Sequence, residues 1–124
     1  MNDLRKEILQ AAQGKIEIAA SDKATGRYSF PPTFIGFSGH FPGYAVLPAF
    51  VQVLSALMIV EKWKGRRLQL LTIEKAKFHI ELRPDQEMTV QCRECEVKGF
   101  PAFEVKLNAA EGLAASFIMR AKPS

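Results

Sequence analysis

The sequence predicts an α+β fold in which an antiparallel sheet wraps around one long helix. Residues 48–63 place apolar side chains on nearly every side of a predicted helix, which indicates that this helix is buried all round. From residue 68 onward, apolar and polar residues alternate with the period of strands, interrupted by turn residues. Because a helix buried on all sides needs a sheet that curves around it, both observations predict the same architecture.

Length and composition indicate one globular domain that spans residues 1–124. Apolar residues make up 48% of the chain and charged residues 24%, which is the balance of a globular protein. The apolar run at residues 53–60 is too short to cross a bilayer, and the N-terminus lacks the apolar core of a signal peptide. We therefore expect a cytoplasmic protein that does not associate with a membrane.

The segment at residues 1–14 predicts a short helix that packs against the rest of the domain, and Gly14 is placed to end it. Its apolar residues, expected on one face, are Leu4, Ile8, Leu9 and Ala12. Two strand-like segments follow at residues 15–19 and 27–30, with Ala24-Thr25-Gly26 expected as punctuation between them. We expect an early hairpin or a bent strand here.

The loop from residue 31 to residue 48 is rich in proline, glycine and phenylalanine, and it is too apolar for an idle surface coil. We expect it to line a site. Pro48 suits the first turn of the following helix, which should run to about Trp63 with Gly65 beyond it. The polar side chains of this helix form a narrow stripe, made of Gln52, Ser55 and Lys62.

The rest of the chain is predicted to form sheet. The apolar phase of residues 68–82 changes between Ile73 and Phe78, which predicts a bulge near residues 74–76. Further strands are expected at residues 87–97, 103–107 and 113–120, joined by connections at 99–101 and 108–112. This order of elements is that of a hot-dog fold. Its exposed sheet edge predicts a second protomer that extends the sheet.

Cys92 and Cys95 form a Cys-x-x-Cys pattern that also occurs in metal and redox sites. The surrounding residues are typical of a strand, in which positions three apart point to opposite faces. A zinc site would need two further ligands, and His40 and His79 are not paired at ligand spacing. We therefore expect two ordinary strand cysteines and no metal. His79 is in phase with Glu81 on a polar strand face, so we expect it to be structural or exposed.

The strongest functional signal is His40, which stands in the segment Gly39-His40-Phe41-Pro42-Gly43 shortly before the long helix. Apolar surroundings favour the neutral imidazole that a general base requires. No Asp or Glu occurs between Asp22 and Glu61, so His40 has no carboxylate near it in sequence. Any function proposed for His40 must account for this gap.

Residues 39–48 resemble the corresponding motif of the 3-hydroxyacyl-[acyl-carrier-protein] dehydratases of bacterial fatty acid synthesis. A second, shorter resemblance covers residues 73–78 and the turn at residues 83–86. With the order of the strands, the resemblance extends over residues 16–121. It implies a hot-dog homodimer with active sites at the subunit interface. It also implies a substrate carried on a phosphopantetheine arm, of acyl carrier protein or coenzyme A, and no separate cofactor.

The resemblance further implies roles for particular residues. His40 removes the α-proton of the substrate, and the backbone N–H at the Pro48-Ala49 helix start binds the thioester carbonyl. The acidic residue of the family stands fourteen places after the histidine, where this sequence has Leu54. The residues implied to bind the substrate are Gly39, Phe41, Gly43, Pro48, Ala49, Phe50, Leu54 and Ser55.

Because Leu54 can neither donate nor accept a proton, three functions stay open. The first is dehydration, with His40 alone or with water, or with an acid from elsewhere in the chain or from a different subunit. The second is binding of acyl thioesters or of acyl carrier protein without catalysis, as the partner of an active dehydratase. The third is thioester hydrolysis, which commonly uses a carboxylate near the thioester.

The chain carries a net charge of +4, and we expect its densest basic cluster to bind the acidic carrier protein. This cluster consists of Lys62, Lys64, Arg66 and Arg67. A solvated surface is the alternative explanation. No recognised nucleic-acid motif accompanies the charge, so we expect no nucleic-acid partner.

Overall fold

The computed structural model describes residues 2–19, 22–37 and 45–124. Within these residues it contains two α-helices, a short 3-10 helix and one sheet. In chain order the elements are α1 (Asn2–Ala11), β1 (Glu17–Ala19), β2 (Lys23–Ser29), η1 (Ile35–Phe37), α2 (Ala49–Lys64), β3 (Leu68–Phe78), β4 (Glu87–Val97), β5 (Phe100–Ala109) and β6 (Gly112–Pro123).

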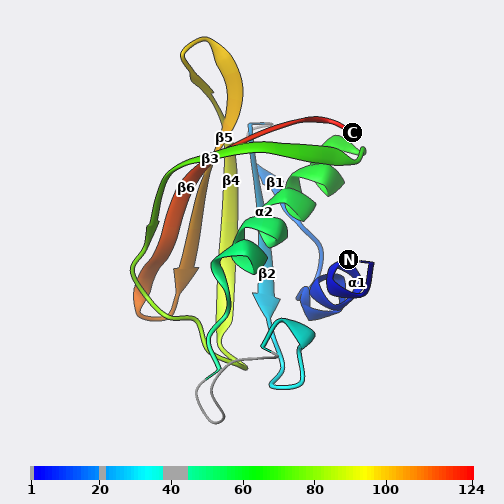
Figure 1. Cartoon of the computed structure of the whole chain (residues 1–124), viewed down its shortest axis with the longest axis vertical. Helices are drawn as coiled ribbons and strands as arrows, with labels where there is room; N and C mark the ends of the chain where they lie inside the picture. The colour runs from blue at the N-terminus through cyan, green and yellow to red at the C-terminus, as the bar shows by residue number, and fades with distance from the viewer. Residues whose placement is uncertain (1, 20–21, 38–44) are drawn as a thin grey trace.

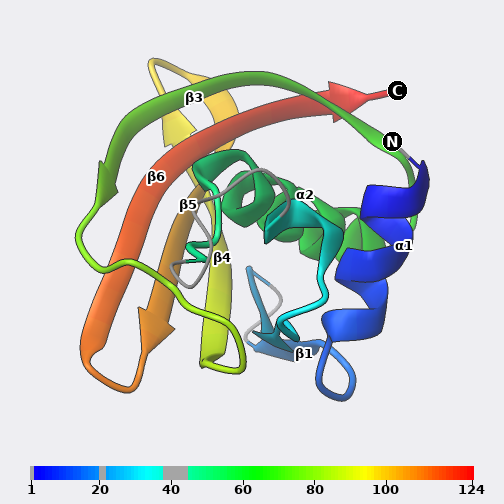
Figure 2. The same cartoon turned by 60° about the horizontal axis from the view of Figure 1, so that its bottom comes forward.

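The six strands form one antiparallel sheet in the order β1-β2-β4-β5-β6-β3. The sheet curves around α2, with α1 on the side of β1 (Figure 1). Figure 2 shows β3 and β6 arching over the helix. Although β3 follows α2 directly in the chain, it forms one edge of the sheet, and β1 forms the other. This is the hot-dog fold that the sequence predicts.

The ends of α2 are set by a proline and a glycine. Pro48 precedes the first helical residue with φ −62° and ψ 151°, angles that its ring permits. Gly65 ends the helix in the left-handed region at φ 70°, and its N–H donates to the Glu61 carbonyl at 2.8 Å. Neither α2 nor any other helix in the described part of the chain is long and apolar enough to cross a membrane.

One face of α2 is open, although the sequence indicated burial on every side. Phe50 is 57% exposed, and Leu54 and Met58, each one turn further along, are half-buried. The polar residues Gln52 and Ser55 are buried instead. The Ser55 hydroxyl donates a hydrogen bond to the Val51 carbonyl, one turn earlier in the helix, at 2.8 Å. A single curved sheet encloses only part of a helix, which leaves this apolar stripe uncovered.

The predicted bulge in β3 is confirmed. The pairing with β6 shifts register between Glu74 and Lys77, and Lys75 has a positive φ of 52°. Ile73 and Phe78 lie on either side of this bulge, and each pairs with a buried residue of β6. The extra residue therefore places Ile73 and Phe78 on the same face of the sheet despite the change of phase.

The hairpin between β4 and β5 is tighter than the sequence indicated. Lys98 and Gly99 have positive φ values of 54° and 82°, and they make the turn by themselves. Phe100 and Pro101, which were expected in the connection, belong to β5. The primed geometry of such a turn matches the twist of the flanking strands, so pairing continues up to the turn.

The helix α1 packs through Ile8 and Ala11, which are both buried. Leu9 was expected on the same face, but it is 60% exposed. Successive residues of a helix are rotated by about 100°, so Leu9 points away from the face that Ile8 buries. The helix packs against the domain as predicted, but Leu9 does not belong to its buried face.

Gly26 marks a close approach between sheet and helix and not the expected turn. It lies inside β2, opposite Val90 of β4. A Cβ at this position would lie 2.8 Å from Cδ1 of Ile59 on α2 and 3.1 Å from its Cγ1. Glycine inside a strand is typical of such a contact.

We expect Gly26→Val to lower the free energy of unfolding by about 1–3 kcal/mol, because the added side chain overpacks the contact with Ile59. Ile59→Val removes the nearest atom, so the double variant should lose less than the sum of the two single variants. Denaturant unfolding followed by circular dichroism measures both. The neighbouring Thr25→Val is the control and should change stability by less than about 0.5 kcal/mol.

Candidate functional site

Only part of the predicted substrate site belongs to the described residues. Gly39, His40, Phe41 and Gly43 lie outside them. Pro48, Ala49, Phe50, Leu54 and Ser55 lie at the start of α2 and in its first two turns. The geometry of the candidate site is therefore set by the N-terminal half of α2 and by the segments beside it.

A cavity of about 170 Å³ lies at the N-terminus of α2. Ala49 and Gln52 line it from the helix, and Phe78 lines it from the end of β3. Its other lining residues are Val46, Leu47, His79, Ile80 and Glu81. The first turn of a helix presents free N–H groups and the positive end of the helix dipole. This cavity therefore suits a group on which negative charge develops.

Hydrogen bonds tie the walls of this cavity together. The Leu47 N–H donates to the Leu82 carbonyl at 2.8 Å, which joins the segment before α2 to the segment after β3. The Gln52 side-chain amide donates to the Leu47 carbonyl at 3.2 Å. Its oxygen, Oε1, is buried and has no partner among the described residues. An unsatisfied buried oxygen is costly, so a hydroxyl or water in the cavity would be stabilised there.

The end of β3 brings two titratable side chains to the cavity. The strand ends at Phe78, earlier than expected, and the N–H groups of His79 and Ile80 both donate to the Ala114 carbonyl, at 2.7 and 3.2 Å. The sequence placed His79 and Glu81 on a polar strand face, but alternation no longer applies after the strand ends. Sequence reasoning therefore missed both as cavity residues, and the change of phase in β3 was the available signal.

The predicted substrate-binding residues of α2 divide between different faces. Ala49 lines the cavity, whereas Phe50 and Leu54 lie on the open stripe. Ser55 is fully buried, and its carbonyl accepts a hydrogen bond from the Tyr28 hydroxyl at 3.4 Å. The structure therefore does not bring Ser55 to the cavity.

The family model described as ApeI dehydratase matches residues 16–117. The chain belongs to the ApeI-like dehydratase family. Two curated relatives are the 3-hydroxyacyl-[acyl-carrier-protein] dehydratases FabZ of Granulibacter bethesdensis, 25% identical over 93 residues, and of Oceanobacillus iheyensis, 28% identical over 92 residues. Each match covers 68% of this chain, but it spans 55% of the first relative and 65% of the second.

Solved structures share the hot-dog fold of this ApeI-like chain. The dehydratase heterocomplex ApeI:P from Xenorhabdus doucetiae has a TM-score of 0.74 and 20% identity, covering 86% of this chain and 93% of that chain. An uncharacterized protein from Erwinia carotovora subsp. atroseptica has a TM-score of 0.69 and 17% identity, covering 91% and 95%. At these identities the likeness establishes the fold alone.

The two cysteines of this ApeI-like chain are ordinary strand residues, as predicted. Both are free and lie in β4. Cys92 is buried with its Sγ 3.8 Å from the Ala56 carbonyl, and burial raises the pKa of its thiol to about 12. Cys95 is half-buried. Across residues 2–19, 22–37 and 45–124 no cluster of His, Cys, Asp and Glu is arranged to hold a metal ion.

The basic cluster that was expected to bind the carrier protein is partly engaged within the chain. Lys64 forms an ion pair with Glu94, and Nε of Arg67 lies 3.5 Å from Oε2 of Glu61. The other two members, Lys62 and Arg66, are exposed. Ion pairing reduces the positive charge that this end of α2 presents to a partner.

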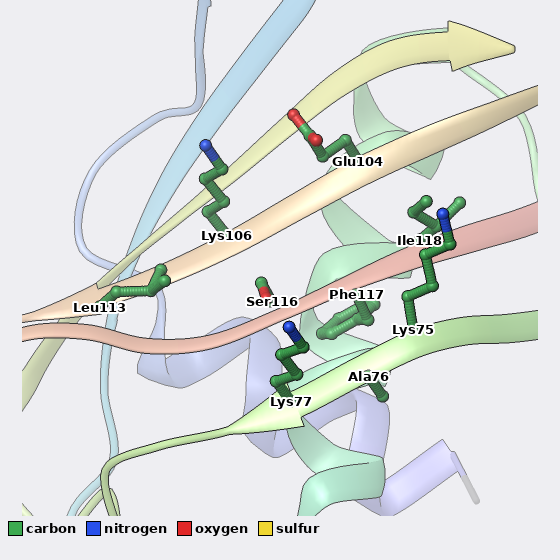
Figure 3. A pocket seen from close by; sticks show the side chains of 9 residues that line it. All are labelled: Lys75, Ala76, Lys77, Glu104, Lys106, Leu113, Ser116, Phe117 and Ile118. Atoms are coloured by element: carbon green, nitrogen blue, oxygen red, sulfur yellow. The ribbon is translucent and has the colours of Figure 1, made fainter.

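A second basic surface is the lysine cleft, which lies across β3, β5 and β6 on the face of the sheet away from α2 (Figure 3). Its volume is about 430 Å³. Lys77 of β3 and Lys106 of β5 lie on either side of Ser116 of β6. Each of the two lysines is the sheet-pairing partner of Ser116 in its own strand pair. Lys75 at the bulge lines the same cleft, together with one acidic residue, Glu104. Three ammonium groups against one carboxylate favour an anionic ligand or partner.

The next carboxylate on α2, Glu61, is committed to holding elements together. Arg5 donates to both of its carboxylate oxygens, at 2.7 and 3.3 Å, and the Leu68 N–H donates to Oε2 at 3.0 Å. These bonds join α1, the end of α2 and the start of β3. Glu61 also lies at the opposite end of α2 from the cavity and does not line it.

We expect Glu61→Gln to lower the free energy of unfolding by about 1–3 kcal/mol, because it weakens charge-assisted bonds to Arg5 and Leu68. Any turnover per folded molecule should be unchanged. Thermal unfolding and an activity assay on the same samples measure both effects, with the exposed Glu96→Gln as the matched control. A variant of full stability that loses turnover would contradict the structural role.

Proposed function

We propose that this ApeI-like protein dehydrates 3-hydroxyacyl thioesters carried on the phosphopantetheine of an acyl carrier protein or of coenzyme A. The family match over residues 16–117 carries the proposal, because it includes both the His40 motif and α2. The FabZ relatives are named as dehydratases of 3-hydroxyacyl-[acyl-carrier-protein]. The cavity beside Ala49 is where a thioester carbonyl would meet the positive end of α2.

The proposed reaction uses a base, an anion site and an acid. His40 takes the α-proton of the thioester. The first turn of α2, at Ala49, stabilises the negative charge that develops on the thioester oxygen. The 3-hydroxyl group takes up a proton and leaves as water. This elimination breaks the Cα–H and Cβ–O bonds, forms the Cα–Cβ double bond and releases water without an external oxidant or reductant, so the proposal needs neither a metal nor a cofactor beyond the phosphopantetheine of the substrate.

A second candidate function is supported by Leu54. A subunit that binds thioesters or carrier protein and leaves catalysis to a different partner needs no acid at this position, so a leucine there fits that role. The solved ApeI:P structure is a dehydratase heterocomplex, which gives this candidate a precedent within the fold. In that case turnover would require the second chain.

A second protomer is proposed to cover the open side of α2. β3 is an edge strand whose Leu71 and Phe78 are 51% and 45% exposed, and the open stripe of α2 presents Phe50. An apolar edge strand beside an apolar helix face favours pairing with another chain. We propose a homodimer in which the sheet continues from β3 of one protomer to β3 of its partner.

We propose that the lysine cleft, rather than the basic cluster at residues 62–67, receives the acidic carrier protein. Lys77 directly precedes Phe78, which lines the cavity, so a carrier in the cleft would lie close to the site. The basic cluster lies at the other end of α2, and two of its members are ion-paired. Positive charge at a rim mainly raises the rate of association with an acidic partner.

The proposed activity predicts that the purified protein converts 3-hydroxyacyl-pantetheine to the enoyl thioester. His40→Ala should lower kcat by about 10²–10⁴-fold, because it removes the general base. Absorbance of the enoyl thioester, followed by mass spectrometry, measures the product. Leu54→Glu restores the family's acid and should not abolish turnover.

Two results separate the candidate functions. No turnover in the wild type, with none gained in Leu54→Glu, would exclude the dehydratase. Tight binding of the thioester by an inactive wild type, with turnover appearing only beside a second subunit, would establish the partner role instead.

The lysine cleft predicts a difference between carrier-linked and small substrates. Lys77→Gln/Lys106→Gln should raise KM for a carrier-linked substrate about tenfold at low salt, because electrostatic attraction to the acidic carrier is lost. KM for the pantetheine substrate should stay unchanged. Lys62→Gln/Arg66→Gln removes the same charge and is the matched comparison. A rise in KM confined to this second pair would place the carrier at the end of α2.

A further inference from the structure

The cavity at the N-terminus of α2 contains a carboxylate that α2 does not supply. Glu81 lines this cavity together with Ala49 and Gln52. Among the described lining residues it is the single acid. The stretch from Asp22 to Glu61 has no carboxylate, and Glu61 itself is held at the far end of the helix. Glu81 is therefore the acid that the fold brings to the site.

The backbone around Glu81 is anchored on both sides. On one side the N–H groups of His79 and Ile80 donate to the Ala114 carbonyl of β6. On the other side the Leu82 carbonyl accepts the Leu47 N–H at 2.8 Å. The segment is thus fixed between β6 and the chain that leads into α2. A catalytic side chain needs such support, because small displacements of a proton donor cost much of its effect.

Burial and charge in the cavity suit a leaving hydroxyl group. Gln52 Oε1 is buried without a partner in the described structure and accepts hydrogen bonds, so it can orient the hydroxyl of a bound substrate. Glu81 is exposed at the wall of the cavity, so a bound substrate can reach its carboxyl group. Ala49 places the positive end of α2 beside both.

We propose that Glu81 is the general acid of this dehydratase and takes the role that Leu54 cannot perform; the inference rests on the proposed function above. His40 removes the α-proton, and the electrons of that C–H bond form the double bond between Cα and Cβ. The bond from Cβ to the hydroxyl oxygen breaks as this oxygen takes the carboxyl proton of Glu81 and leaves as water. His40 then loses its proton to solvent, and Glu81 regains one.

The decisive experiment separates removal of the α-proton from departure of the hydroxyl group. Glu81→Gln should lower kcat for 3-hydroxyacyl-pantetheine by about 10²–10⁴-fold with little change in KM. Exchange of the α-proton into D₂O, measured on the unreactive saturated acyl thioester by NMR, should persist in Glu81→Gln and be lost in His40→Ala. A merely structural role for Glu81 would lower both readouts together.

Two further variants keep the test independent of folding. Glu81→Asp retains a carboxyl group and should keep more activity than Glu81→Gln. Glu87→Gln, an exposed carboxylate at the start of β4, is the matched control and should behave as the wild type. An active wild type whose Glu81→Gln variant keeps its kcat would overturn the role of Glu81 and leave the dehydratase proposal standing. An inactive wild type would overturn both.

Discussion

Gly26 of β2 lies so close to α2 that a Cβ there would come within 2.8 Å of Cδ1 of the Ile59 side chain. This contact is one of those that hold the sheet against α2. The bulge at Lys75 shifts the register of β3 against β6, and Glu61 fixes the end of α2 to α1 and β3. Because one sheet encloses only part of the helix, an apolar stripe around Leu54 stays open beside the edge strand. The packing that forms the core thus also leaves an apolar surface uncovered.

The same packing shapes the candidate site. β3 ends at Phe78, and the N–H groups of the next two residues, His79 and Ile80, donate to the Ala114 carbonyl of β6. This segment closes a cavity against the first residue of α2, and it carries Glu81 into the cavity wall. The resemblance implies an acid at the position of Leu54, and the proposed role of Glu81 moves that acid to a neighbouring segment. The chemistry needs a proton donor at the right place and not a particular element to carry it.

Sequence reasoning was most accurate where the governing interactions are local. The change of apolar phase between Ile73 and Phe78 required a bulge, because strand residues alternate strictly between two faces. It was wrong at Gly26, since a glycine permits either a turn or a close approach, and the neighbour that decides between them is distant in the chain. Of the residues that the resemblance implied for the site, Ala49 lines the cavity and Ser55 is buried away from it.

By itself the sequence determined the hot-dog fold and the family, because these depend on periodicity and on residue types in fixed order. Only the tertiary structure decided which residues surround the start of α2. Glu81 and Gln52 are far apart in the chain and carry no shared pattern. Both line one cavity because the segment that follows β3 is hydrogen-bonded to β6 and to the segment before α2. Such long-range bonds leave no trace in the local sequence.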